Sequence, residues 1–182
     1  MVIRITGNAT ILEEATPDDA EIMCKLRNDP NNNRFLSSTK PITVPEQQEW
    51  MRSKAKKMDN IDFKIIDKKT GEVCGLVAIY DVKNHVAEFG RYICTKPLQS
   101  MEAEYLVLKF GFDIMYLDMM YCRTMKDNKF VWNQHYKYGF KDIREEVLGP
   151  RQMLHKIQEL TRDQFHQFDY SFIDKLISRI QQ

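Results

Sequence analysis

The segment Asn128-Lys-Phe-Val-Trp-Asn-Gln-His-Tyr-Lys-Tyr-Gly139-Phe140 decides the fold of this chain of 182 residues. It places an asparagine eleven positions before a Gly-Phe pair, and the intervening residues predict one helix. Glycine commonly ends a helix because it adopts left-handed backbone without steric cost. We therefore expect a helix that begins at Asn128 and a strand that begins at Phe140.

The composition excludes some classes of protein. Lysine and arginine number 27 and aspartate and glutamate 26, so no basic excess is present for binding nucleic acid phosphates. A chain of this length fits one domain that buries about 70% of its unfolded surface. A single domain spanning residues 1–182, with no nucleic acid partner, is expected.

The four cysteines are Cys24, Cys74, Cys94 and Cys122, which lie far apart in apolar segments without a Cys-x-x-Cys pair. They are interpreted as buried reduced thiols, and no metal site is expected. The N-terminus lacks the apolar core of a signal peptide, and no stretch approaches the roughly 18 apolar residues of a membrane span. No membrane insertion and a cytoplasmic location are expected.

Periodicity and turn signals predict the order of elements. They are a strand at 9–14, a helix at 16–28, a polar loop at 28–33, a helix from Thr43 with Trp50 on its buried face, a three-strand meander at 61–94, a helix from Ser100, a strand at 119–125, the helix at 128–138, two strands at 140–157 and a terminal helix from Thr161. The terminal helix is expected to bury one apolar face, made of Phe165, Phe168, Phe172, Ile173, Leu176 and Ile180.

This order, with the segment from Asn128 to Phe140, resembles the GNAT superfamily of acetyl-coenzyme A dependent N-acetyltransferases over residues 9–159. The resemblance implies an α/β (α+β) fold of three layers: a mixed, mostly antiparallel sheet with a splayed strand pair, plus a C-terminal helix at 161–182. The strands at 88–94 and 120–125 would splay and hold the pantetheine arm like an added strand. The implied cosubstrate is acetyl-CoA, without metal. The implied cofactor-binding residues are Ile93, Cys94, Thr95, Gln99, Ser100, Met101, Ala103, Asn128 and Asn133.

The resemblance also implies catalytic residues. The eighth position of the decisive segment, where the superfamily commonly has a tyrosine that protonates the departing thiolate, holds His135. An imidazole with a pKa near 6.5 would transfer its proton downhill to a thiolate with a pKa near 8.5. Tyr136 and Tyr138 remain alternative donors. Glu88 is the favoured base for the amine, and His85 a weaker one.

One motif departs from the superfamily pattern. The turn that usually offers glycine amides to the pyrophosphate reads Gln99-Ser-Met-Glu102-Ala-Glu104, with glutamates at both glycine positions. A carboxylate in the first helical turn competes with a phosphate. We expect binding to survive, with both glutamates pointing outward and with Lys96, Gln99 and Ser100 as donors.

The segments 26–35 and 41–51 resemble the acceptor side of bacterial enzymes that acetylate nucleotide-linked amino sugars, of the pseudaminic acid pathway type. A sugar nucleotide would supply a diphosphate for cationic side chains and a base for aromatic stacking. The predicted substrate-binding residues are Arg27, Asn28, Arg34, Phe35 and Trp50, with Lys40 as a further cation. The alternative is that Arg27 and Asn28 only cap the first helix and Trp50 fills the core.

The expected function is therefore acetylation of the amine of a nucleotide-linked amino sugar by direct attack in a ternary complex. A covalent route through Cys94 is a minor alternative. The alternative hypotheses for the function are a protein N-terminal acetyltransferase of the ribosomal-protein type and a non-catalytic acyl-CoA-binding protein. A homodimer is left open.

Overall fold

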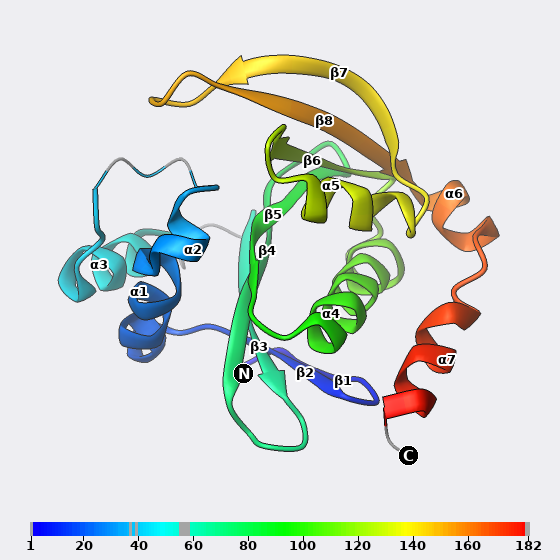
Figure 1. Cartoon of the computed structure of the whole chain (residues 1–182), viewed down its shortest axis with the longest axis horizontal. Helices are drawn as coiled ribbons and strands as arrows, with labels where there is room; N and C mark the ends of the chain where they lie inside the picture. Colours follow the sequence, from blue (N-terminus) through cyan, green and yellow to red (C-terminus); the bar gives the residue numbers. More distant parts are fainter. Residues whose placement is uncertain (1, 37, 39, 55–58, 181–182) are drawn as a thin grey trace.

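A computed structural model describes residues 2–36, 38, 40–54 and 59–180 of the chain. Its centre is one eight-stranded sheet in the order β1-β2-β3-β4-β5-β6-β8-β7, in which β5 and β6 form the parallel pair (Figure 1). The strands are β1 Arg4–Thr6, β2 Thr10–Glu14, β3 Asn60–Asp67, β4 Val73–Lys83, β5 Val86–Cys94, β6 Met119–Met125, β7 Lys141–Leu148 and β8 Met153–Thr161. The predicted mixed, mostly antiparallel sheet is confirmed.

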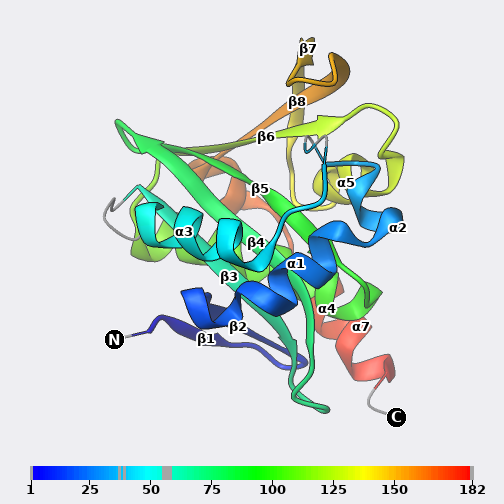
Figure 2. The same ribbon diagram turned by 90° about the vertical axis from the view of Figure 1, so that its left-hand side faces the viewer.

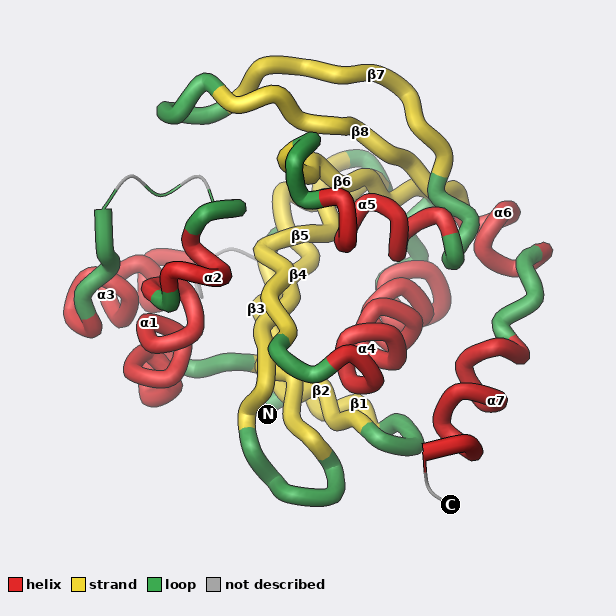
Figure 3. The backbone as a smooth tube through the Cα atoms, in the orientation of Figure 1, coloured by secondary structure: helices red, strands yellow, loops and turns green. Residues whose placement is uncertain are grey.

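Helices cover both faces of the sheet, which gives three layers (Figures 1 and 3). One face carries α1 (Ala20–Asn28), α2 (Pro30–Asn33) and α3 (Val44–Lys54), which stand in front of the strands in Figure 2. The other carries α4 (Pro97–Lys109), α5 (Lys129–Tyr136), α6 (Arg162–Gln167) and α7 (Ser171–Ile180). Each face has its own buried cluster of apolar side chains. None of the helices in the described part of the chain is long and apolar enough to cross a membrane.

The predicted splayed strand pair is present. Strands β5 and β6 are paired from Val86 opposite Met119 to Glu88 opposite Tyr121, and no pair joins them beyond that point. The register of β5 against β4 also shifts in this region, between Leu76 and Ala78 of β4. Arg91, inside this bulge, has a φ of 51°, the left-handed region that non-glycine residues rarely adopt. The two strands therefore separate with free edges facing one another.

Helix α4 differs from its prediction. It begins at Pro97, three residues before Ser100, and has no acidic residue in its first turn. Glu102 and Glu104 are buried in the following turn, at 2% and 0% exposure. The expectation that they point outward is wrong. Glu102 instead accepts hydrogen bonds from the backbone N–H groups of Asn8 and Ala9, at 2.6 and 2.8 Å.

The polar segment after α1 was expected to be a loop but contains the short helix α2. Hydrogen bonds of the polar side chains in this segment explain the difference. The Asp29 carboxylate caps the turn by accepting from the backbone N–H of Asn31 at 2.8 Å. Asn32 and Asn33 donate side-chain hydrogen bonds to carbonyls at the end of α1. In α3, Met51 and Gln47 are the buried residues, so Trp50 is not the main core anchor of that helix.

The terminal segment forms two helices rather than the one that was predicted. Thr161 does cap the first, α6, but Phe168 has extended backbone and ends it. The Asp169 carboxylate then accepts from Ser171 N–H at 2.8 Å and begins α7. Phe165 and Ile173 are buried as expected, whereas Phe168 is 39% exposed. The side chain of Ile180 lies outside the described residues.

The inward position of Glu102 yields a stability prediction. Replacing Glu102 by alanine leaves the partly buried N–H groups of Asn8 and Ala9 without their acceptor, and an unsatisfied buried donor costs up to roughly 1–3 kcal/mol. We expect a drop of roughly 1–3 kcal/mol in the free energy of unfolding, measured by urea titration. Glu21→Ala, an exposed site on α1, is the matched control and should change the value by less than about 0.5 kcal/mol. Equal effects of the two substitutions would contradict the prediction.

Candidate active site

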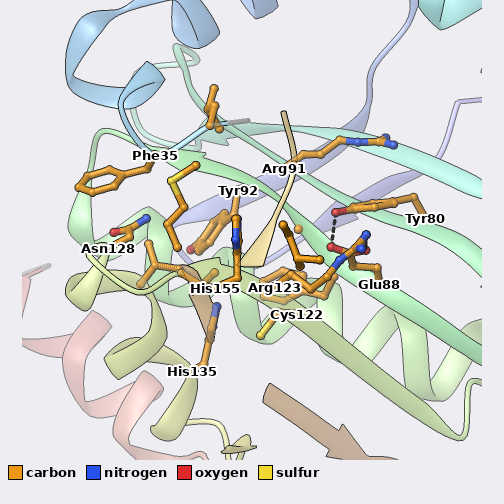
Figure 4. Close-up of a pocket in the computed structure, with 18 of the residues that line it drawn as sticks. Phe35, Tyr80, Glu88, Arg91, Tyr92, Cys122, Arg123, Asn128, His135 and His155 are labelled. Atoms are coloured by element: carbon orange, nitrogen blue, oxygen red, sulfur yellow. Dashed lines mark hydrogen bonds and ion pairs between the residues drawn. The ribbon is translucent and has the colours of Figure 1, made fainter. Parts of the chain in front are cut away.

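A cavity of about 280 Å³ opens where β5 and β6 separate (Figure 4). Its walls come from the ends of both strands, from α5, from the segment that follows α2 and from the β7–β8 turn. The residues that line it are Arg27, Phe35, Leu36, Tyr80, Glu88, Phe89, Gly90, Arg91, Tyr92, Cys122, Arg123, Thr124, Met125, Asn128, Val131, His135, Leu148, Gly149 and His155. The splay thus brings together residues from distant parts of the sequence.

The side chain of His135 is held in place by Glu104, a residue of α4. Its Nδ1 lies 2.6 Å from Oε1 of Glu104, and both residues are almost completely buried. Gln134 donates to the other oxygen of Glu104, also at 2.6 Å. The His135 ring packs against Phe89 and Phe140, with centroid distances of 5.5 and 5.2 Å. The imidazole therefore has one orientation, which is set by a buried carboxylate and two aromatic rings.

The charge of His135 follows from these neighbours. Burial alone would lower the pKa of the imidazole, but the neighbouring Cys122 thiol and the Glu104 carboxylate, which is hydrogen-bonded to Nδ1, raise it to about 10. The imidazolium is thus the main form at neutral pH. The raised pKa of His135 reduces the driving force that was expected for proton transfer to a coenzyme A thiolate, because that expectation assumed an unshifted pKa near 6.5.

Glu88 lies on β5, in the last β5–β6 pair before the two strands separate. It is 3% exposed, accepts a hydrogen bond from the Tyr80 hydroxyl at 2.6 Å and forms an ion pair with Arg123. Tyr80 reaches Glu88 by lying across Gly90, where a Cβ would come within 2.7 Å of the tyrosine hydroxyl. Desolvation and the nearby Glu88 charge raise the pKa of Tyr80 well above its usual value. Tyr80 therefore stays a neutral donor.

A second cavity of about 360 Å³ lies on the α1–α3 side, and Arg27 and Arg91 line both cavities. The other residues of its lining are Lys40, Pro41, Ile42, Glu46, Gln47 and Trp50. Arg91 forms an ion pair with Asp62 at 3.0 Å, and its guanidinium lies over the rings of Tyr80 and Trp50 at 4.0 and 4.8 Å. The acceptor side thus has a cationic wall with an aromatic face.

The two other proton donors considered from the sequence do not line the cavity. Tyr138 is completely buried and donates to the Met101 carbonyl. Tyr136 is 38% exposed, and its hydroxyl donates to Asp142 at 2.6 Å. Of the three residues, one lines the cavity. That residue is His135.

The predicted cofactor-binding residues also differ in whether they line the cavity. Asn128, next to the first turn of α5, lines the cavity, whereas Asn133 bonds the Lys129 carbonyl of its own helix. Ala103 is part of the core, and Ile93 packs in the cluster on the α1–α3 face. Cys94 and Thr95 hydrogen-bond the carbonyls of Lys96 and Cys74, and Gln99, Ser100 and Met101 lie in the first turns of α4.

The acceptor-side predictions fall into two groups. Arg27 and Phe35 line the main cavity, and Trp50 lines the second. Asn28 holds the segment before α3 through a pair of hydrogen bonds with the backbone of Ile42, at 2.8 and 2.9 Å. Arg34 lies over the Phe35 ring, outside the lining of either cavity. Asn28 therefore holds the segment before α3, and neither Asn28 nor Arg34 forms a wall of either cavity.

The splay suits an acyl-CoA arm, because the facing edges of β5 and β6 have no mutual pairs beyond Glu88 and Tyr121. Of the donors expected for the pyrophosphate, Lys96 is already bonded to Asp67 at 2.6 Å and Glu72 at 3.2 Å. The Ser100 hydroxyl lies 2.6 Å from the Tyr92 hydroxyl, and its carbonyl accepts from the same group. The free amides of the first turn of α4 remain the natural phosphate contact. Among the described residues, no cluster of three or more His, Cys, Asp or Glu side chains could hold a metal ion.

Sequence reasoning missed several residues of the site. Arg91, Arg123, Tyr80 and Cys122 line the cavity, and Glu104 holds His135 from behind. The role of Glu104 could have been predicted from the sequence. A glutamate at a position where a helix start usually has glycine needs a hydrogen-bond or charge partner if it is buried. The others depend on which face of β4, β5 or β6 turns toward the splay.

A mixed sheet with a splayed parallel pair, a helix that starts beside the splay and a cavity at its apex define an acyl-CoA-dependent acyltransferase fold. The sequence model of the acetyltransferase (GNAT) domain matches residues 10–141. The chain belongs to this family, and it is an acetyl-CoA-dependent acetyltransferase. No curated protein matches the sequence.

Solved structures agree with this assignment. Apo FdhC, described as a nucleotide-linked sugar GNAT, superposes with a TM-score of 0.78 at 22% identity, over 92% of this chain and 94% of that one. The spermidine N-acetyltransferase of Vibrio cholerae in complex with CoA and spermine gives 0.77 at 16% identity, over 88% and 99%. A GCN5-related N-acetyltransferase of Brucella melitensis gives 0.74 at 18%, over 97% and 84%. At these identities the likeness establishes the fold.

The raised pKa of His135 predicts a pH dependence of stability. The proton is bound more tightly in the folded state, so its stabilisation is complete below the unfolded pKa near 6.5 and is lost as the pH rises toward 10. We expect the difference in free energy of unfolding between the wild type and His135→Gln to shrink steadily across that window. Urea titrations at pH 6, 8 and 10 measure it. A difference that stays constant would show that His135 is neutral in the folded protein.

Proposed function

We propose that the protein transfers the acetyl group of acetyl-CoA to the amine of a nucleotide-linked amino sugar. The observation that carries this proposal is the pair of arginines, Arg27 and Arg91, that lines both cavities. The Nε of Arg27 is buried and has no hydrogen-bond partner among the described residues. Burial and the neighbouring Arg91 both lower the pKa of Arg27, so each guanidinium raises the electrostatic cost of the other. An anionic ligand between them would satisfy the donor and relieve the repulsion.

A nucleoside diphosphate fits this wall better than other acceptors do. The second cavity has Arg27, Arg91 and Lys40 against one carboxylate, Glu46, and Trp50 offers an aromatic face to a base. Polyamines, the substrates named for several similar structures, are cations and would require the opposite charge. A free peptide N-terminus would also favour acidic residues. The likeness to FdhC adds support through its described substrate class.

In this proposal the two sides of the splay have separate tasks. The unpaired amides of β5 would polarise the thioester carbonyl, and the bulge at Arg91 turns that part of the strand toward the cavity. Asn128 and the first turn of α4 would hold the cofactor arm and its phosphates. Glu88 would accept the proton of the amine, directly or through water. His135 would return a proton to the sulfur of coenzyme A.

A substrate panel tests the acceptor. We expect free thiol release from acetyl-CoA with UDP- or dTDP-linked amino sugars and none with spermidine or with an N-terminal peptide. Turnover confined to spermidine or to the peptide would overturn the sugar-nucleotide proposal. Turnover with none of these amines, together with tight binding of acetyl-CoA, would support a non-catalytic binding protein.

Arginine substitutions locate the diphosphate site. Arg27→Met should raise the KM for the sugar nucleotide roughly 10- to 100-fold, because a charge-assisted hydrogen bond contributes about 1.5–3 kcal/mol. The KM for acetyl-CoA should stay within about twofold of the wild type, since Arg27 lies on the acceptor side. The matched control is Arg144→Met on the exposed face of β7, which should change neither constant. Equal increases for both substrates would instead indicate general damage to the fold.

A further inference from the structure

We infer that His155 is a second proton acceptor for the amine, which takes the proton that the nitrogen loses as the amide forms. His155 lies on β8, far along the chain from Glu88, and its ring lines the main cavity (Figure 4). The inference rests on the proposed direct transfer to an amine. It holds equally for an amino sugar, a polyamine or a peptide as the acceptor.

The backbone of β8 fixes the tautomer of His155. Its Nδ1 lies 2.7 Å from the carbonyl oxygen of Met153, and a carbonyl can only accept, so Nδ1 carries a proton. The other ring nitrogen, Nε2, has no hydrogen bond to any residue that the structure describes. The residue is only 8% exposed, although it lines the cavity. In the neutral ring, Nε2 is therefore a free acceptor at the wall of the site.

The register of the sheet places His155 beside the proposed base Glu88. Arg123 of β6 is opposite Ile157 of β8, so His155, two residues before Ile157, lies on the same face of the sheet as Arg123. Diagonal neighbours of this kind are typically about 7–8 Å apart across two antiparallel strands. Arg123 is also the ion-pair partner of Glu88. Glu88 and His155 are therefore both neighbours of one side chain, on one face of the sheet.

The other ionisable groups of the lining are less suited to take this proton. The arginines of the cavity wall can only donate. His135 already holds a proton at neutral pH, since the nearby carboxylate of Glu104 helps to raise its pKa to about 10. Glu88 has the first proton of the amine as its task. An imidazole with a free lone pair exchanges protons readily near neutral pH, and His155 supplies one.

The proton balance of the reaction requires two acceptors. An amine that arrives as an ammonium ion loses one proton before it attacks, and Glu88 takes that proton. The nitrogen then attacks the thioester carbonyl, the C–N bond forms, and the bond from the carbonyl carbon to the sulfur of coenzyme A breaks. Nε2 of His155 takes the second proton from the nitrogen, while His135 gives one to the sulfur. When the three side chains return to their starting states, one proton has passed to the solvent.

The tautomer of His155 can be measured without any substrate. The four histidines of the wild-type protein are labelled with nitrogen-15, and single substitutions of His85, His135 and His166 assign their signals. Long-range couplings between ring protons and nitrogens, recorded at pH 8.5, then show which nitrogen carries the proton. We expect the proton of His155 on Nδ1 and none on Nε2. A proton on Nε2 would overturn the inference, and failure of the amino-sugar panel would leave this measurement unaffected.

Variants test the transfer with whichever amine of the substrate panel is turned over. His155→Ala should lower kcat roughly 100-fold or more, the usual contribution of a general base, and leave the KM for acetyl-CoA unchanged. Added imidazole should restore part of that kcat, an effect that a purely structural role would not produce. His155→Gln, which fills the site but cannot take the proton, should be slow without rescue.

The matched control is His166→Ala on α6, a half-exposed histidine outside the lining of both cavities, which should change neither constant. Full kcat in folded His155→Ala would overturn the inference. A rise in the KM for the amine without a loss of kcat would also overturn it, because His155 would then only bind the amine.

Discussion

The separation of β5 from β6 after Glu88 and Tyr121 is the constraint on which the rest of the structure depends. Two parallel strands that stop pairing leave backbone donors and acceptors inside the protein, and such groups are costly unless something bonds them. The bulge at Arg91 turns one edge away from its neighbour, and the entry into α5 at Asn128 closes the opening from the side. The cavity is therefore a consequence of unmet pairing, and a ligand that pairs with the two edges completes the sheet.

The cost of leaving buried polar groups without partners also explains the contacts of the two buried acids of α4. Family members usually have glycines where this chain has Glu102 and Glu104, and a buried carboxylate is tolerated only with good partners. Glu102 finds backbone N–H groups in the β1–β2 turn, and Glu104 finds His135 and Gln134. Each acid thus ties α4 to another element. Glu104, at a position where the family resemblance implies a glycine, thus supplies the carboxylate that pairs with His135, at the position where that resemblance implies a tyrosine.

Much of the fold could be predicted from the sequence, because strands such as 86–94 and 119–125 have clear hydrophobic patterns between turn residues. The family segment also located Asn128 and His135 at the splay. Other features could not be read in this way. The start of α4 depends on Pro97 as a first helical residue, and the break at Phe168 depends on a local cap by Asp169. The partners of a side chain, such as Glu104 for His135, depend on the packing of distant elements. Local patterns do not encode that packing.

The charge distribution across the splay completes the argument for the proposed function. In the proposed function, a sugar amine would reach the site mainly as an ammonium ion, and it would have to lose a proton before it could attack. Arg27, Arg91 and Arg123 all line the cavity on the acceptor side, and nearby positive charge disfavours the protonated amine. Glu88, which is already paired with Arg123, can then be a modest base, because the site itself lowers the cost of deprotonation. Thus the cations that would hold the diphosphate would also prepare the nucleophile.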